Sequence, residues 1–76
     1  MTIEQVRGLY QARPFHPFVM HLADGREIPV PHQEFMAIGP TGRTVFVYDE
    51  HESFNIVDLL RVTDIRVENG SKRRKR

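Results

Sequence analysis

Hydrophobic and polar positions alternate with two different periods along the chain. Over residues 3–12 the hydrophobic side chains recur at helical spacing, and Thr2 with Gln5 has the Thr-x-x-Gln spacing of a capping box. We therefore predict an amphipathic helix over these residues. Pro14 and Pro17 disfavour helical backbone before them, so an extended linker should follow. The hydrophobic face of the helix comprises Ile3, Val6, Leu9 and Tyr10.

From residue 18 onwards the period shortens to that of β-strands, and glycine-containing turns separate the stretches. Asp24-Gly25 is typical of a two-residue type I′ hairpin, which would pair His21 with Ile28 across the strands. In that register Pro29 and Pro31 direct their missing N–H groups away from the first strand, so the outer edge cannot donate to a third strand. The expected strand segments cover residues 18–23, 26–30, 34–38, 43–49, 53–57 and 62–67, and the segments 26–30 and 34–38 can be one long second strand that bends at the prolines.

One helix followed by about five short strands predicts a mainly β fold. We expect an N-terminal helix followed by a small five-stranded antiparallel barrel, because closure removes exposed sheet edges. A curved open sheet with the helix on one face is the alternative. Residues 1–69 would form this single domain, and residues 70–76 have the composition of a disordered basic tail.

Two stretches carry more hydrophobic surface than one interior face can bury. Residues 45–48 are Val-Phe-Val-Tyr, and residues 56–60 include four aliphatic side chains. Strand alternation places only half of each stretch inside. Either the helix covers the outer half or an identical chain does, and we favour self-association because one short helix is small cover for both. The expected oligomer interface comprises Phe46, Tyr48, Ile56, Val57, Leu59 and Leu60.

The segment Leu22-Ala23-Asp24-Gly25-Arg26 is similar to the Leu-x-Asp/Asn-Gly hairpin in the first motif of the Sm-like family. Phe35 follows it, and Val57, Val62 and Ile65 match the hydrophobic spacing of the second motif. The chain therefore resembles Sm-like proteins over residues 3–67. This resemblance implies a barrel of the SH3-like or Sm-like kind, a ring of identical chains, and association with RNA.

The residues that contact nucleotides in Sm-like proteins are not matched here. The family's glycine in the second strand falls on Val30. Met36-Ala37-Ile38 stands where the family has an Asp followed by an Asn, and Asp58-Leu59-Leu60 stands where it has Arg-Gly or, in the bacterial form, Tyr-Lys-His. The resemblance thus implies a ring-forming barrel without the family's usual RNA site. The chain also resembles a group of short bacterial proteins without an assigned activity, in the segments Met1-Thr2-Ile3-Glu4-Gln5, His21-Leu22-Ala23-Asp24-Gly25-Arg26 and Asp58-Leu59-Leu60.

Charge is divided unevenly along the chain, although the formal net charge is only +1. The last five residues are all Lys or Arg, whereas the preceding 71 carry six such cations against ten acids. An acidic body therefore carries a basic tail, and five adjacent cations can displace counterions from a nucleic acid. A ring would present many tails together and raise the avidity. A role in solubility alone is the alternative for this tail, which comprises Lys72, Arg73, Arg74, Lys75 and Arg76.

Other features of the sequence give little support to catalysis or metal binding. The chain has no Cys, which excludes disulfides and thiol chemistry. Ser53 and Ser71 lack the flanking residues of a nucleophile. Residues 49–52 fit a solvated loop better than a metal site, and residues 39–44 fit a turn better than a phosphate loop. We expect no enzyme activity, no cofactor and no metal.

These features lead to one hypothesis and one alternative. No stretch approaches the roughly 20 hydrophobic residues of a membrane span, and the first residues do not resemble a signal peptide, so we expect a cytoplasmic protein without membrane contact. The hypothesis is a non-enzymatic Sm-like barrel that self-assembles into a ring and associates with RNA or another polyanion mainly through its basic tail. The alternative is a protein-interaction module that docks a partner through an exposed strand edge or hydrophobic face, with the tail incidental.

Overall fold

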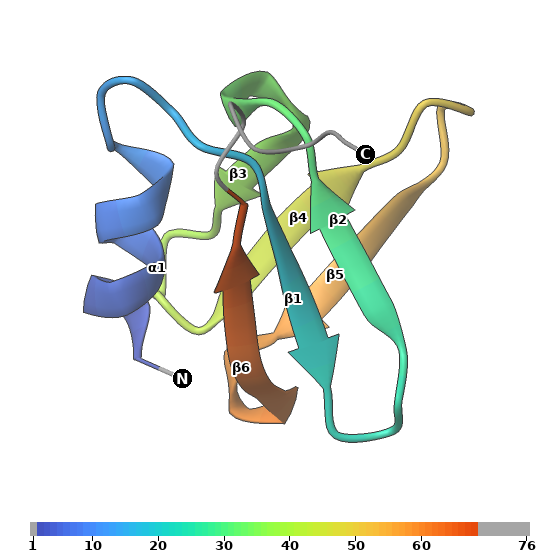
Figure 1. The fold of residues 1–76 in the computed structure, drawn as a ribbon. Helices are drawn as coiled ribbons and strands as arrows, with labels where there is room; N and C mark the ends of the chain where they lie inside the picture. Colours follow the sequence, from blue (N-terminus) through green and yellow to red (C-terminus); the bar gives the residue numbers. More distant parts are fainter. Residues whose placement is uncertain (1, 69–76) are drawn as a thin grey trace.

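The computed structural model describes residues 2–68, which form one helix and six strands arranged as two three-stranded antiparallel sheets (Figure 1). One sheet has the strand order β2-β1-β6 and the other has the order β3-β4-β5. The prediction of a mainly β fold with an N-terminal helix is confirmed. The elements are α1 (Ile3–Tyr10), β1 (Phe18–Leu22), β2 (Glu27–Val30), β3 (Met36–Ile38), β4 (Thr44–Tyr48), β5 (Phe54–Asp58) and β6 (Val62–Val67), with the 3₁₀-helices η1 (Gln33–Phe35) and η2 (Leu59–Arg61).

The helix α1 begins with the predicted capping box. The hydroxyl of Thr2 accepts a hydrogen bond from the Gln5 N–H (3.4 Å), and the Gln5 side chain accepts one from the Thr2 N–H (3.1 Å). The helix ends at Tyr10 rather than at residue 12, and there the Gln33 side chain donates to the Tyr10 carbonyl (2.7 Å). Val6 is fully buried, so α1 is anchored to the strands through one side.

The hairpin between β1 and β2 differs from its prediction by one residue. Leu22 and Arg26 close a three-residue loop, in which the Leu22 N–H donates to the Arg26 carbonyl (2.9 Å) and Gly25 has a φ of 94°. The predicted two-residue type I′ turn and the predicted pairing of His21 with Ile28 are therefore wrong.

Burial of the strand residues explains this register. Cross-strand partners project to the same face of a sheet, so a core residue must lie opposite another core residue. Met20 and Ile28 are partners and both are buried, whereas the two-residue turn would have placed Ile28 opposite the partly exposed His21. The loop needs a residue with positive φ, and Gly25 adopts that conformation without steric cost.

The two sheets do not close into a barrel within residues 2–68. β1 pairs with one edge of β2, and Pro29 has no N–H with which to bond a strand on the other edge. After Pro31 the chain forms η1, so the prediction of a strand at residues 34 and 35 is wrong. β3 begins after η1 and pairs with β4. The long second strand of the expected five-stranded barrel is thus divided into β2 and β3.

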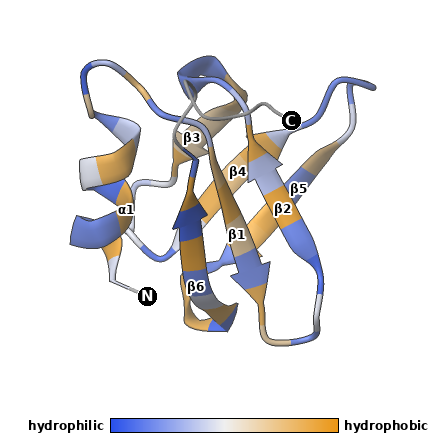
Figure 2. Ribbon diagram, viewed as in Figure 1, coloured by the Kyte–Doolittle hydropathy of each residue, from blue (hydrophilic) through white to orange (hydrophobic). Residues whose placement is uncertain are grey.

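The core between the sheets is made of hydrophobic side chains only. Figure 2 shows hydrophobic and hydrophilic positions alternating along β2, as expected for a strand with one buried face. Among the described residues no polar or charged side chain is buried. The buried side chains are those of Val6, Phe18, Met20, Leu22, Ile28, Val30, Met36, Val45, Val47, Val57, Leu59 and Val62.

Candidate interaction surfaces

The outer side of β4 and β5 is hydrophobic and largely uncovered. Phe46 lies opposite Ile56, and Tyr48 lies opposite Phe54, in the register of the two strands. The rings of Tyr48 and Phe54 stack with their centroids 5.4 Å apart. Tyr48, Phe54 and Ile56 are 49, 51 and 64% exposed, and Phe46 is half-buried. We call these four residues the β4–β5 face.

The β4–β5 face is about as large as the largest hydrophobic patch on a typical monomeric protein. With side chains of this size and exposure it presents about 300 Å² of hydrophobic surface, at the lower end of the range for the largest patch on a typical monomer. The helix does not cover it, because α1 lies on the flank of the molecule away from β5 in Figure 1 and turns its hydrophobic side chains to the core. The N-terminal helix therefore does not cover the outer side of β4 and β5, so that one of the two predicted alternatives is wrong.

The structure divides the six residues of the expected oligomer interface. Val57 and Leu59 are 4 and 3% exposed and belong to the chain's own core, so a partner cannot contact them. Leu60 is 86% exposed in η2, where its N–H donates to the Asp58 carboxylate (3.0 Å). Phe54 completes the β4–β5 face, although it is not one of the predicted interface residues. Phe54 lies two positions before Ile56, so strand alternation from the predicted interface residue Ile56 would have identified it. The four that remain at the surface are Phe46, Tyr48, Ile56 and Leu60.

The edge of β5 adjoins this face and, unlike the edge of β2, is not protected against pairing with another strand. β5 is the last strand of its sheet, so its outer N–H and C=O groups have no strand partner within residues 2–68. β2 is also an edge strand, but Pro29 protects it against pairing. β5 contains neither Pro nor Lys, which are residues that commonly protect such edges.

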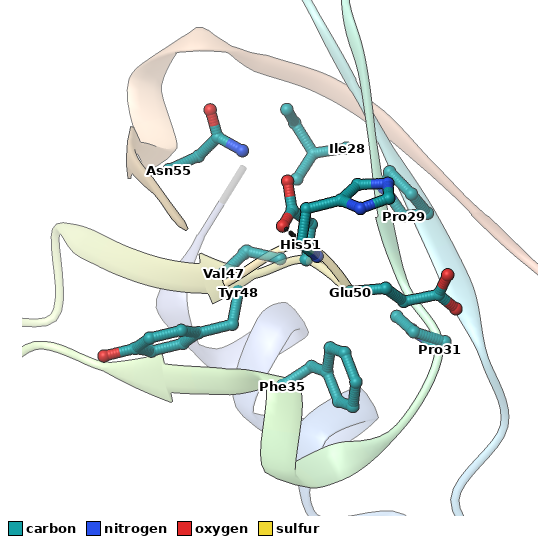
Figure 3. Close-up of a pocket in the computed structure, with 10 residues that line it drawn as sticks. Ile28, Pro29, Pro31, Phe35, Val47, Tyr48, Glu50, His51 and Asn55 are labelled. Atoms are coloured by element: carbon teal, nitrogen blue, oxygen red, sulfur yellow. Dashed lines mark hydrogen bonds between the residues drawn. The ribbon is translucent and has the colours of Figure 1, made fainter. Parts of the chain in front are cut away.

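A pocket of about 310 Å³ opens between β2 and the end of β4, where the two sheets separate (Figure 3). Its polar rim comes from the loop between β4 and β5, with Asp49, Glu50 and His51, and from Asn55 of β5. The hydrophobic lining comprises Ile28, Pro29, Pro31, Phe35, Val47 and Tyr48. The pocket therefore combines a hydrophobic interior with carboxylates at its mouth.

The loop between β4 and β5 is organised by one carboxylate. Asp49 Oδ1 accepts hydrogen bonds from the N–H groups of His51 (2.8 Å) and Ser53 (3.1 Å). Glu52 has a φ of 68°, which is unusual for a residue other than glycine. Asp49, Glu50 and Glu52 are exposed, and none of the three forms an ion pair with another described residue. The loop thus carries three negative charges that lack an ion-pair partner among the described residues, and Asp49 and Glu50 line the pocket.

His21 lies between two carboxylates on the outer side of the other sheet. Its Nδ1 is 2.7 Å from Asp64 Oδ1 on β6, and its Nε2 is 3.6 Å from Glu27 Oε2 on β2. Both carboxylates are well exposed, so these contacts contribute little to stability. In the part of the chain that the structure describes, no three His, Asp or Glu side chains are gathered so that they could hold a metal ion.

The expected nucleic-acid-binding residues, Lys72 to Arg76, lie outside the described residues. The structure does describe the end of β6 and Glu68, which come before them in the chain. Val67 lies opposite Phe18, and the Glu68 N–H donates to the Pro17 carbonyl (2.8 Å).

Comparison with known proteins identifies no relative. No protein-family profile, no curated protein and no solved structure matches the chain. The resemblance to Sm-like proteins therefore stays a prediction. None of the helices between residues 2 and 68 is long and hydrophobic enough to cross a bilayer.

Proposed function

We propose that the protein is a non-enzymatic β module that binds further copies of itself through the β4–β5 face, as a ring-forming Sm-like barrel would. The observation that carries this proposal is the exposure of Tyr48, Phe54 and Ile56 on one sheet face. A standard interface buries about 800 Å² per partner, of which somewhat more than half is hydrophobic. The roughly 300 Å² of the β4–β5 face supplies more than half of that hydrophobic share.

The position of the face next to the edge of β5 also favours a second copy as the occupant. A partner that covers the face can bond its own strand to this edge, which satisfies backbone groups and buries hydrophobic side chains together. The protected edge of β2 offers no such pairing. Among the edge strands β2, β3, β5 and β6, β5 itself carries part of the hydrophobic face, so association is expected on the β5 side of the molecule.

A charge placed on the β4–β5 face should dissociate the assembly. We expect light scattering to give a mass several times 8.9 kDa for the unmodified chain. Ile56→Lys should lower the mass towards 8.9 kDa, because burial of the Lys ammonium in a hydrophobic interface is unfavourable.

Val67→Lys is the matched control, because Val67 is also hydrophobic and 47% exposed but lies on β6. This variant should keep the mass of the unmodified assembly. Equal masses for the two variants would contradict association through the β4–β5 face.

The basic tail is the second part of the proposed function, since we propose that it binds RNA. Five cations in a row support this, because each phosphate contact releases counterions. Removal of residues 72–76 should abolish filter binding of a single-stranded RNA. For the full chain the logarithm of affinity should fall by about 3 to 4 per tenfold rise in salt if all five cations contact phosphates. Equal binding by both chains would remove the tail from RNA recognition.

A module that binds a different protein is the second candidate, because the open edge of β5 can equally accept a strand from another protein. The two candidates differ in the mass of the isolated chain. A monomer at high micromolar concentration, together with tail-independent RNA binding or none, would favour the second candidate.

A further inference from the structure

We propose that the basic residues 72–76 dock on their own chain, in the pocket between β2 and the end of β4. Lys and Arg side chains combine a hydrophobic stem with a cationic head group. The pocket offers both complements, because its interior is hydrophobic and its rim carries Asp49 and Glu50. Its volume of about 310 Å³ lies at the lower end of the range for ligand pockets, which suits a single long side chain.

Charge complementarity supports this occupant. Asp49, Glu50 and Glu52 place three negative charges in one exposed loop and lack ion-pair partners among the described residues. In Figure 3 the Glu50 side chain extends towards Pro31, so its carboxylate lies beside the mouth of the pocket. A segment with five adjacent cations can neutralise all three charges.

The distance between the tail and the pocket is short. Val67 and Val30 lie opposite the same residue, Phe18, on the two sides of β1. They are therefore about 10 Å apart, which is two strand spacings. Pro31 of the pocket lining directly follows Val30. The eight residues after Glu68 can span up to about 27 Å, so the last cations of the tail have enough chain to reach the rim.

Attachment to the same chain makes weak docking sufficient. A short flexible connection gives an effective concentration in the millimolar range, so an affinity that would be negligible between separate molecules can occupy the pocket. An unattached basic peptide would have to match this concentration in solution. For this reason the tail, rather than a separate partner, is the proposed occupant.

Docking has a regulatory consequence if the tail also binds RNA, a point that rests on the proposed function. The same cations cannot contact the acidic rim and phosphates together. The apparent affinity for RNA is then reduced in proportion to the fraction of undocked tails. The acidic loop would therefore act as a competitor that selects for densely charged nucleic acids.

The docking itself is tested by nuclear magnetic resonance without RNA. Amide spectra of the full chain and of a chain shortened to residue 71 should differ at Phe35, His51 and Asn55, which line the pocket. In the double variant Glu50→Gln with Glu52→Gln, removal of residues 72–76 should change these amide shifts at most half as much as it does in the unmodified chain. Raising the salt to about 0.5 M should have the same effect, because the contact is between exposed charges.

The control carries the same change of charge away from the pocket, in Glu4→Gln with Glu27→Gln, both exposed positions. It should keep the full tail-dependent shifts. If removal of residues 72–76 leaves the pocket amides unchanged, or if both double variants lose the shifts equally, the docking proposal is wrong.

An RNA titration separates this proposal from the proposed function. Release of the tail in Glu50→Gln with Glu52→Gln should tighten RNA binding about threefold to tenfold relative to the control double variant, which corresponds to a docked fraction of about 70 to 90%. Tail-dependent pocket shifts without any RNA binding would uphold docking and overturn the RNA function. RNA binding without such shifts would do the reverse.

Discussion

Gly25 and Glu52 occupy equivalent positions in two hairpin loops of the same length. In each loop the residue donates its N–H back across the turn, Gly25 to the Leu22 carbonyl (2.9 Å) and Glu52 to the Asp49 carbonyl (3.3 Å). Both have positive φ, 94° and 68°. Glycine adopts this conformation freely, whereas other residues lose about 1–2 kcal/mol there. The loop between β4 and β5 thus retains a charged residue at a position where glycine is more favourable.

Substitution of Glu52 by glycine should stabilise the protein. We expect Glu52→Gly to raise the free energy of unfolding by about 0.5–1 kcal/mol, which is the relief of strain less the greater entropy of glycine in the unfolded chain. Urea unfolding measures the change. Gly25→Ala should destabilise by a similar amount, and a lower stability of Glu52→Gly would contradict the equivalence of the two loops.

Asp24 should contribute to the acid sensitivity of the first hairpin. The Arg26 backbone N–H, which donates to Asp24 Oδ1 (3.1 Å), and then the Arg26 side chain lower the pKa of this carboxyl below its ordinary value. A carboxyl with a lowered folded-state pKa stabilises the fold above its unfolded pKa of about 4, and this contribution is lost as the pH falls through the folded-state pKa. The stability difference between the unmodified chain and Asp24→Asn should therefore shrink between pH 7 and pH 3 in urea unfolding. A stability difference that stays constant with pH would show that protonation of Asp24 is not coupled to folding.

At the level of the elements, local patterns predict the helix and the strands well but not their connections. The capping box of Thr2 and Gln5 correctly identifies the start of α1, since both hydrogen bonds involve neighbours in sequence. The short helix η1 is missed because Gln33 bonds to the carbonyl of Tyr10, a contact that depends on how α1 docks. The loop after β1 is misassigned because the Asp24-Gly25 dipeptide suits both a two-residue and a three-residue turn, and only burial decides between them.

The helix α1 can be stabilised at Gly8. A Cβ added there would meet no atom within 4 Å, and Gly8 is exposed in the interior of the helix. Gly8→Ala should raise the free energy of unfolding by about 0.5–1 kcal/mol, because alanine loses less backbone entropy in a helix. Thermal unfolding measures this gain.

Gly39 provides the contrasting position. A Cβ there would lie 3.0 Å from the Thr44 carbonyl oxygen, so Gly39→Ala should destabilise the connection between β3 and β4. Stabilisation by both substitutions would show that backbone entropy outweighs the close approach at Gly39.

For the whole molecule, two features explain why the candidate surfaces were only partly predictable. The surplus of hydrophobic residues in β4 and β5 was visible in the sequence, but the partition between core and surface depends on which side of each strand faces the other sheet. Val57 lies inside and Phe54 outside for that reason, whereas Leu59 is buried in η2. The pocket was not predicted, because it arises from the separation of two sheets at Pro29 and Pro31.

The charge distribution has a similar dependence on the fold. The sequence separates an acidic body from a basic tail, but it does not reveal that three of the acids share one loop beside a hydrophobic pocket. The net charge of +1 therefore combines two surfaces of opposite sign that can meet in one molecule.

Self-association through the β4–β5 face is the central claim, and sedimentation equilibrium of the unmodified chain over a range of concentrations tests it most directly. The claim predicts a mass that rises with concentration to several times 8.9 kDa in the tens of micromolar. It also predicts that Ile56→Lys shifts this rise to much higher concentrations. A mass that stays at 8.9 kDa up to several hundred micromolar would contradict the claim.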